Sequence, residues 1–281
     1  MTEVNNRIIL SKDEILASLH QLPMLSAVVQ DVIASFKENQ LAPSILSKIS
    51  KDQGLSAKIL RVANSSFYGL SRKVASIPES AMVIGFNGVR SLALSAGFVL
   101  AFSHDSDDAF DRRAYWLHSF RVAGYTQALA KCLGHDHQAA FTVGMFYEIG
   151  QLVFNVCIPE VFASILSEQK KSAANLIQVE QAKLGFDHAM IGAEMAKRWN
   201  FPQEIEHAIL YWRTPEHEPF EFNTAMVHVA VLLESGLRGE ELINRLSESL
   251  CERLDLSWER IEKTIPDPDQ LDAEAKQILD S

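Results

Sequence analysis

The chain has 281 residues, of which 47% are hydrophobic, with 13 Gly and 9 Pro. This composition excludes a disordered or collagen-like polymer and is sufficient for one large core or two modest ones. The first residues lack the charged-then-apolar pattern of an export signal, and no uninterrupted apolar run reaches the roughly 18 residues of a membrane-spanning helix. We therefore expect a globular cytoplasmic protein that does not enter a membrane. Its three scattered cysteines predict core thiols, not disulfides or a thiolate metal cluster.

The formal net charge of −10 is unevenly distributed along the chain. Residues 216–281 hold 16 Asp and Glu against 6 Lys and Arg, whereas residues 1–215 hold 20 of each. Residues 37–90 form a mildly basic region, with eight positive side chains against three acidic ones. An excess of five positive charges is a weak signal for phosphate binding and is more typical of a solvated helix face. The charge pattern therefore argues against nucleic acid as the main partner.

Apolar residues recur at the helical period in almost every segment, and no convincing strand alternation is present, so we predict an all-α fold. In the first hundred residues the period predicts helices over 25–36, 45–49 and 55–62. A further helix begins at Ser76 with Pro78 in its first turn, and Gly85 separates it from another over 89–99.

A turn-forming segment, Asn64-Ser65-Ser66-Phe67-Tyr68-Gly69, interrupts this helical pattern and carries two aromatic residues. The two rings either cover the core or form an exposed contact, and the sequence leaves both readings open. Together with nearby basic residues the segment is a candidate interaction surface, whose members are Asn64, Phe67, Tyr68, Lys58, Arg61 and Arg72.

A polar, acid-rich stretch at residues 104–108 predicts a boundary between an N-terminal helical lobe, 1–104, and a second lobe, 105–215. The acidic residues 216–281 form a third part that we expect to pack on the second lobe. The period and the helix-stop residues predict helices over 112–133, 136–156, 161–170, 175–184, 188–199, 203–212, 223–235, 240–254, 257–265 and 269–279. Gly134 and Gly185 are expected to end two of them, and Asp187 to cap another.

The segments around His118, Tyr147-Glu148 and His188 follow one another in the order expected of a helical metal phosphohydrolase. Such enzymes bring His and Asp side chains together from several helices, because hard divalent ions bind imidazole and carboxylate and must keep open positions for water and phosphate. Here Tyr147-Glu148 stands where an adjacent His-Asp pair would be needed.

The chain resembles the HDOD family, the catalytically degenerate output-domain relatives of the HD and HD-GYP phosphohydrolases. The resemblance rests on Leu22-Pro23-Met24-Leu25, on the run from Ser50 to Gly69 that ends Ala-Asn-Ser-Ser-Phe-Tyr-Gly, and on Ile77-Pro78-Glu79-Ser80-Ala81. It covers roughly residues 15–215 and is weaker in the last 65 or so. The resemblance implies a bacterial signal-transduction module without catalytic activity, whose signalling partner binds in trans.

The resemblance also implies a set of vestigial metal-site positions. His118 and His188 occupy two family histidine positions, Tyr147 and Glu148 replace the His-Asp pair, Trp212 and Arg213 replace a His-His pair, and Val231 replaces a closing Asp. Only His118, Glu148 and His188 could still bind a metal ion. We expect no metal, no cofactor and no catalytic residue, because Tyr, Arg and Val oppose a bound divalent ion. The two histidines are then buried imidazoles hydrogen-bonded to neighbours, and Glu148 pairs with one of them or with Arg213.

Two other hypotheses remain open at this stage. The chain could be a divergent metal-dependent phosphohydrolase in which Glu148 replaces the lost Asp, or a regulator that binds a nucleotide or nucleic acid through the basic region 37–90. A small ligand or nucleotide in the remnant cleft is compatible with the leading hypothesis as well.

Overall fold

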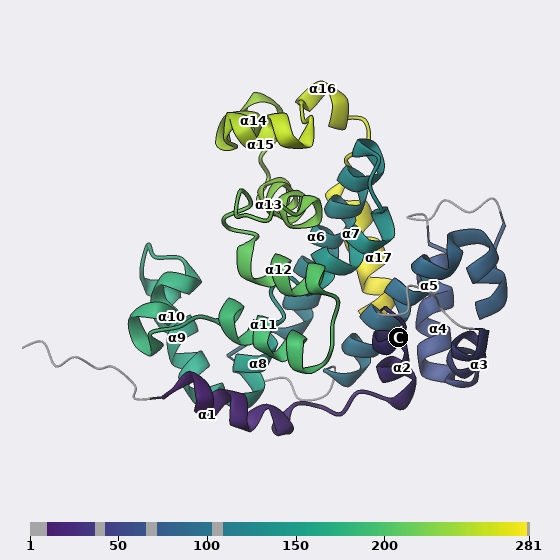
Figure 1. Cartoon of the computed structure of the whole chain (residues 1–281), viewed down its shortest axis with the longest axis horizontal. Coiled ribbons are helices and arrows are strands. Elements are labelled where there is room, and N and C mark those ends of the chain that lie inside the picture. The colour runs from purple at the N-terminus through teal and green to yellow at the C-terminus, as the bar shows by residue number, and fades with distance from the viewer. Residues whose placement is uncertain (1–9, 37–42, 66–71, 103–108, 280–281) are drawn as a thin grey trace, which may run out of the picture.

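The computed structural model describes residues 10–36, 43–65, 72–102 and 109–279 of the chain. These residues form an all-α fold, without β-strands in the described ranges, as predicted (Figure 1). The N-terminal part contains α1 (Lys12–Ala17), a 3₁₀ turn (Ser18–Gln21), α2 (Ala27–Ser35), α3 (Pro43–Lys51), α4 (Gln53–Ala63) and α5 (Ile77–Ala101). Helices α2, α3 and α4 pack against α5, on the right in Figure 1.

The central part is built around α6 (Arg112–Leu133) and α7 (His137–Phe146), which pack along each other. It continues with α8 (Gly150–Cys157), α9 (Pro159–Lys171), α10 (Leu176–Leu184), α11 (His188–Arg198) and α12 (Gln203–Tyr211). Helices α8 and α11 approach so closely that a Cβ on Gly150 would lie 1.9 Å from the carbonyl oxygen of His188. Glycine is therefore required at this contact.

The C-terminal part contains α13 (Phe222–Glu234), α14 (Gly239–Arg245), α15 (Glu248–Leu254), α16 (Trp258–Ile261) and α17 (Pro268–Leu279). Helix α13 packs against α6, α7 and α12, while α17 contacts both α6 and α4. Helices α14 to α16 lie at the top of Figure 1, and α17 returns alongside α6. The last residues thus contact both the central part and the N-terminal part.

The helix ends follow the local signals of the sequence. Asp187 caps α11 by accepting a hydrogen bond from the backbone N–H of Met190, and Ser76 caps α5 in the same way. Gly134 and Gly185 end α6 and α10 in the left-handed conformation, with φ of 81° and 86°. Gly85, with φ 78° and ψ 164°, breaks the helical path of α5, so the predicted interruption at this glycine is confirmed.

Three predicted helices differ from the structure, and one helix was not predicted. The helix expected over 257–265 is shortened to α16, Trp258–Ile261. The helix expected over 136–156 is divided into α7 and α8 at Tyr147–Ile149, where the backbone stays helical but tightens, with bonds such as that from the N–H of Ile149 to the carbonyl of Phe146. The helix expected over 240–254 is divided at Leu246, whose extended backbone lets Ser247 cap α15. Helix α1 was not predicted, although Ser11 and Glu14 form a capping box at its start. The predicted boundary at 104–108 lies outside the described residues.

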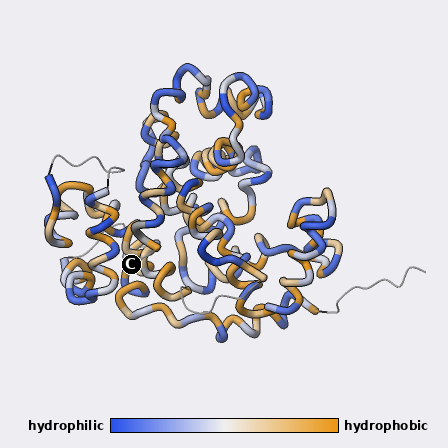
Figure 2. Tube along the Cα trace, turned by 180° about the vertical axis from the view of Figure 1, so that it is seen from behind, coloured by the Kyte–Doolittle hydropathy of each residue, from blue (hydrophilic) through white to orange (hydrophobic). Residues whose placement is uncertain are grey.

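The core is apolar and continuous, and hydrophobic residues alternate with hydrophilic ones along most helices (Figure 2). Two stretches, Ile77–Ala101 and His137–Cys157, are long and apolar enough to cross a membrane by length and composition. This differs from our expectation of none, because a window average tolerates the polar residues that interrupt each run. Of these two windows 67% and 78% are buried inside the protein, as in core helices of soluble proteins, so the test is weak evidence for a membrane span.

Candidate functional site

The vestigial metal-site positions come from five elements, and six of these positions lie next to one another: His118, Tyr147, Glu148, His188, Trp212 and Arg213. His118 lies on α6, Tyr147 and Glu148 lie on the turn between α7 and α8, and His188 is the first residue of α11. Trp212 and Arg213 follow α12, and Val231 lies on α13. Tyr147 and Glu148 therefore lie in the turn between α7 and α8, which the sequence analysis did not predict.

His118 has side-chain partners at both ring nitrogens. Its Nε2 lies 2.5 Å from Tyr147 Oη and 3.8 Å from Glu148 Oε2, and its Nδ1 lies 3.2 Å from Glu234 Oε1. Burial alone would lower the pKa of His118, but the hydrogen bond to Glu234 and the charges of Glu148 and Glu234 outweigh it and raise that pKa. The two carboxylates thus favour the charged imidazolium form of His118.

Glu148 is paired with a cation from the protein itself. Arg213 donates from Nη2 to Glu148 Oε1 at 3.3 Å, and Gln151 donates to Oε2 at 2.9 Å. The Arg213 guanidinium also stacks 4.0 Å from the Trp212 ring centroid, and Trp212 packs edge-on against Tyr147 at 5.1 Å. Burial lowers the pKa of Arg213, and Glu148 partly reverses this effect. Glu148 thus pairs with Arg213, one of the partners that the sequence left open.

His188 is fully buried and belongs to a separate pair. Its Nδ1 lies 2.8 Å from Glu180 Oε2, and its backbone N–H donates to the same oxygen at 3.0 Å. Burial lowers the pKa of His188, but the charge and hydrogen bond of Glu180 outweigh it, so that the pKa is raised. Its Nε2 lacks a hydrogen-bond partner among the described residues and lies 4.0 Å from Glu148 Oε1.

The sequence reasoning missed Glu234, Glu180 and Arg121. Glu234 accepts from Arg121 Nη2 at 2.7 Å as well as contacting His118, and Arg121 also donates to Asp272 Oδ1 at 2.8 Å. Burial would raise the pKa of Glu234, but His118 and Arg121 lower it to about 2. Glu234 lies one helical turn after Val231, so the position of Val231 was a signal that could have identified it. Glu180 carries no comparable signal in the sequence.

The residues present do not fit a divalent metal ion. Within residues 10–36, 43–65, 72–102 and 109–279, three or more His, Cys, Asp or Glu nowhere form a group that could hold one. Val231 is a half-buried apolar residue packed against the core. The Arg213 guanidinium already pairs with the carboxylate of Glu148, which would have to bind the ion. A second positive charge beside that guanidinium is unfavourable.

The candidate interaction surface is only partly exposed. Lys58 is 4% exposed and is therefore part of the interior, and the amide of Asn64 bonds to the backbone of Leu60 and Val74, where it holds the two segments together. Arg61 is exposed, and Arg72 is exposed and pairs with Glu79 at 3.2 Å. Phe67 and Tyr68 lie outside the described residues.

Comparison with known protein families decides the family. The model of the HDOD domain matches residues 22–215, which is more than half of the chain. The chain belongs to the HDOD domain family. This confirms the resemblance drawn from the sequence, and the match ends close to residue 215, where we placed the start of the acidic C-terminal part.

Solved HDOD and related structures share this fold. A protein from Shewanella amazonensis SB2B, named "Putative phosphohydrolase", is 26% identical with a TM-score of 0.77, and the alignment covers 94% of this chain and 98% of that one. An HDOD domain protein of unknown function from Geobacter sulfurreducens is 20% identical with a TM-score of 0.73, covering 95% and 96%. A protein from Marinobacter aquaeolei VT8, named "Putative signal transduction protein", is 22% identical with a TM-score of 0.75, covering 97% and 62%.

A curated relative from Treponema pallidum (strain Nichols), named an uncharacterized protein, is 25% identical over 263 residues. The alignment covers 92% of this HDOD chain and 50% of the relative. The chain therefore spans about half the length of the curated relative that it matches.

Proposed function

We propose that this HDOD protein is a non-catalytic bacterial signal-transduction module that acts by binding a signalling protein in trans. The observation that carries the proposal is the internal pairing of the vestigial site. Arg213 forms an ion pair with Glu148, and Tyr147 and Glu234 contact the two ring nitrogens of His118. A site whose charged groups neutralise one another has lost the open positions that metal-assisted hydrolysis requires.

The proposal is tested by metal content and by hydrolysis. We expect protein purified without chelators to contain much less than one equivalent of divalent metal by elemental analysis, and to hydrolyse neither generic phosphoesters nor cyclic dinucleotides. A full metal complement together with metal-dependent turnover would contradict the proposal. A homologue with an intact His-Asp pair, assayed in parallel, serves as the positive control.

A divergent metal-dependent phosphohydrolase is the second candidate. Two observations favour it: the buried His188 Nε2 lacks a partner within the described residues, and the Shewanella amazonensis relative carries the name "Putative phosphohydrolase". In that case turnover would depend on added metal and would be abolished in His118→Ala. The first proposal expects no turnover in either protein, so the same assay separates the two candidates.

We further propose a cytoplasmic location, and we leave a small ligand or nucleotide in the remnant cleft as a subsidiary binding function. A nucleic-acid role for the basic region receives less support, because Lys58 is buried. Charge reversal at the exposed Arg61 should therefore leave any retention on nucleic acid unchanged in a salt-dependent binding assay.

A further inference from the structure

A second concave surface lies away from the vestigial site, where three parts of the chain meet. This groove, of about 970 Å³, is bounded by the segment before the kink of α5, by α6 and the start of α7, and by the segment that leads into α17. Its lining residues include Met82, Val83, Ile84, Lys131, His137 and Lys263. Its volume is within the range of binding sites on proteins.

One wall of the groove is apolar and exposed. Met82 is 78% exposed, Val83 46%, and the adjacent Phe86 49%. Large apolar side chains gathered on a surface mark a contact site more often than scattered single ones do. These exposed side chains lie on both sides of the kink at Gly85, where the first segment of α5 ends.

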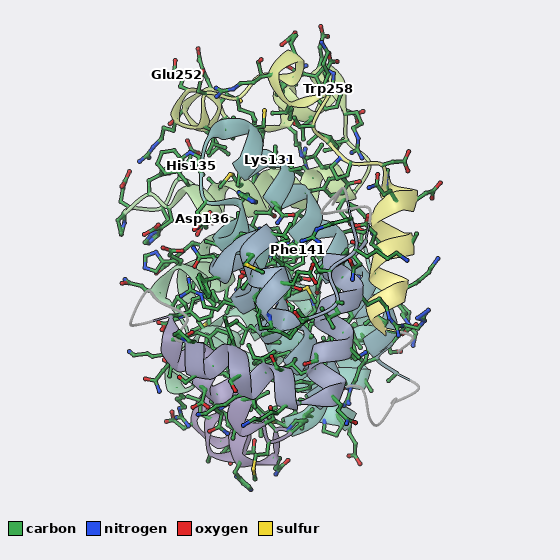
Figure 3. The ribbon with its side chains drawn as sticks, turned by 90° about the vertical axis from the view of Figure 1, so that its right-hand side faces the viewer. Lys131, His135, Asp136, Phe141, Glu252 and Trp258 are labelled. Atoms are coloured by element: carbon green, nitrogen blue, oxygen red, sulfur yellow. The ribbon has the colours of Figure 1, made fainter. Side chains whose placement is uncertain are left out.

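Two lysines, one from α6 and one from the segment before α17, also line the groove. Lys131 and Lys263 are both exposed, and neither has an ion-pair partner within the described residues. His137 lines the groove as well, and no Asp or Glu is among its described lining residues. This is unusual in a chain of net charge −10, whose last 66 residues are strongly acidic. Figure 3 shows Lys131 near the junction of α6 and α7, with His135 and Asp136 close by.

We propose that this groove binds an acidic amphipathic helix of a partner protein. The apolar face of the helix packs on Met82 and Val83, and its carboxylates pair with Lys131 and Lys263. The proposal rests on the proposed function, because it gives the partner surface of a module that acts by protein binding. The concavity of the surface favours a helix over a lipid bilayer, which requires a protruding apolar element.

The test uses the full chain and a synthetic probe. The probe is a fluorescent helical peptide of about 15 residues with Leu at positions i, i+3, i+4 and i+7 and Glu on both flanks. We expect saturable binding by anisotropy that weakens with salt and falls about tenfold in Lys131→Glu/Lys263→Glu. Met82→Ser is expected to weaken binding as well, and a photo-cross-linker on the Leu face should label residues 82–86.

Matched variants serve as controls. Lys170→Glu/Lys171→Glu reverses two exposed lysines at the end of α9, and Met24→Ser replaces a methionine that is 90% exposed elsewhere. Neither should change binding, and circular dichroism should show all variants folded.

Several results would overturn the groove proposal. They are the absence of saturable binding up to about 1 mM peptide, equal binding of the peptide with Lys in place of Glu, or equal losses in the control variants. Binding of the chain to phosphatidylglycerol vesicles without binding of the peptide would assign the surface to a membrane instead. A dimer of the chain, seen in sedimentation velocity and lost in the groove variants, would assign it to a second copy. None of these results bears on metal content, so the groove proposal can fail while the proposed function stands.

Discussion

The two family histidines of the vestigial site have opposite surroundings. His188 and Glu180 are both fully buried, and they lie only eight residues apart in the chain. His118 is 29% exposed and its partner Glu234 16%, and this pair joins α6 to α13. One histidine has thus become part of the core, and the other an ionic link between helices near the surface. Two histidines at neighbouring positions of one site are thus held by two different kinds of pairing, one in the core and one near the surface.

The largest expected effect comes from removing the carboxylate of the buried pair. Glu180→Ala leaves the His188 imidazole without its partner in the interior, and we expect it to lower the free energy of unfolding by about 3–5 kcal/mol. Glu234→Ala is the matched variant at the partly exposed pair, where solvent screens the charges, and should cost about 1 kcal/mol. Urea unfolding measures both, and equal losses would show that the distinction between the pairs is false.

The buried pair also depends on the close approach of α8 and α11. Gly150→Ala places a Cβ 1.9 Å from the His188 carbonyl oxygen and should lower the free energy of unfolding by about 2–3 kcal/mol, because backbone must move. Gly134→Ala is the control at an exposed left-handed helix end without neighbours within 4 Å, and should cost about 1 kcal/mol. Thermal unfolding of the two variants tests the order of the two losses. A smaller loss in Gly150→Ala than in Gly134→Ala would contradict the prediction.

The smallest expected effect is the pH dependence of the stability that the partly exposed pair of His118 and Glu234 contributes. The raised pKa of His118 gives stabilisation that is complete below its ordinary pKa of 6.5 and is lost as pH rises through the raised value. The pKa of Glu234, lowered to about 2, gives stabilisation that is present above 4.5 and is lost as pH falls towards 2. The pair is therefore fully stabilising between these ordinary values, from pH 4.5 to pH 6.5.

His118→Gln checks this pH dependence. We expect the wild-type chain to lose about 1 kcal/mol of unfolding free energy between about pH 6 and pH 9, and the variant to lose less. Because the pKa of His188 is raised too, the variant should keep part of the slope. A slope in His118→Gln equal to that of the wild-type chain would mean that His118 carries no proton-linked stability.

Much of the fold followed from local signals in the sequence. The helix over Arg112–Leu133 was predicted with its bounds from its apolar period and from Gly134, which acts on backbone groups within one turn. The turn at Tyr147–Ile149 was not predicted, because the apolar period continues through it, and the close packing of the next residue, Gly150, on α11 was not predicted either. The apolar period of a single helix does not predict which other helix it contacts.

For the candidate site too, the sequence predicted one part and the tertiary structure decided the rest. The sequence by itself determined that Tyr147, Trp212, Arg213 and Val231 stand where the family resemblance would place metal ligands, because residue identity needs no coordinates. Only the tertiary structure decided that Glu234 pairs with His118 and that Glu180 pairs with His188. The groove beside Met82 and Lys131 is likewise formed by segments distant in sequence. Helix caps and helix periods act over one or two turns, whereas ion pairs and grooves depend on how whole helices pack.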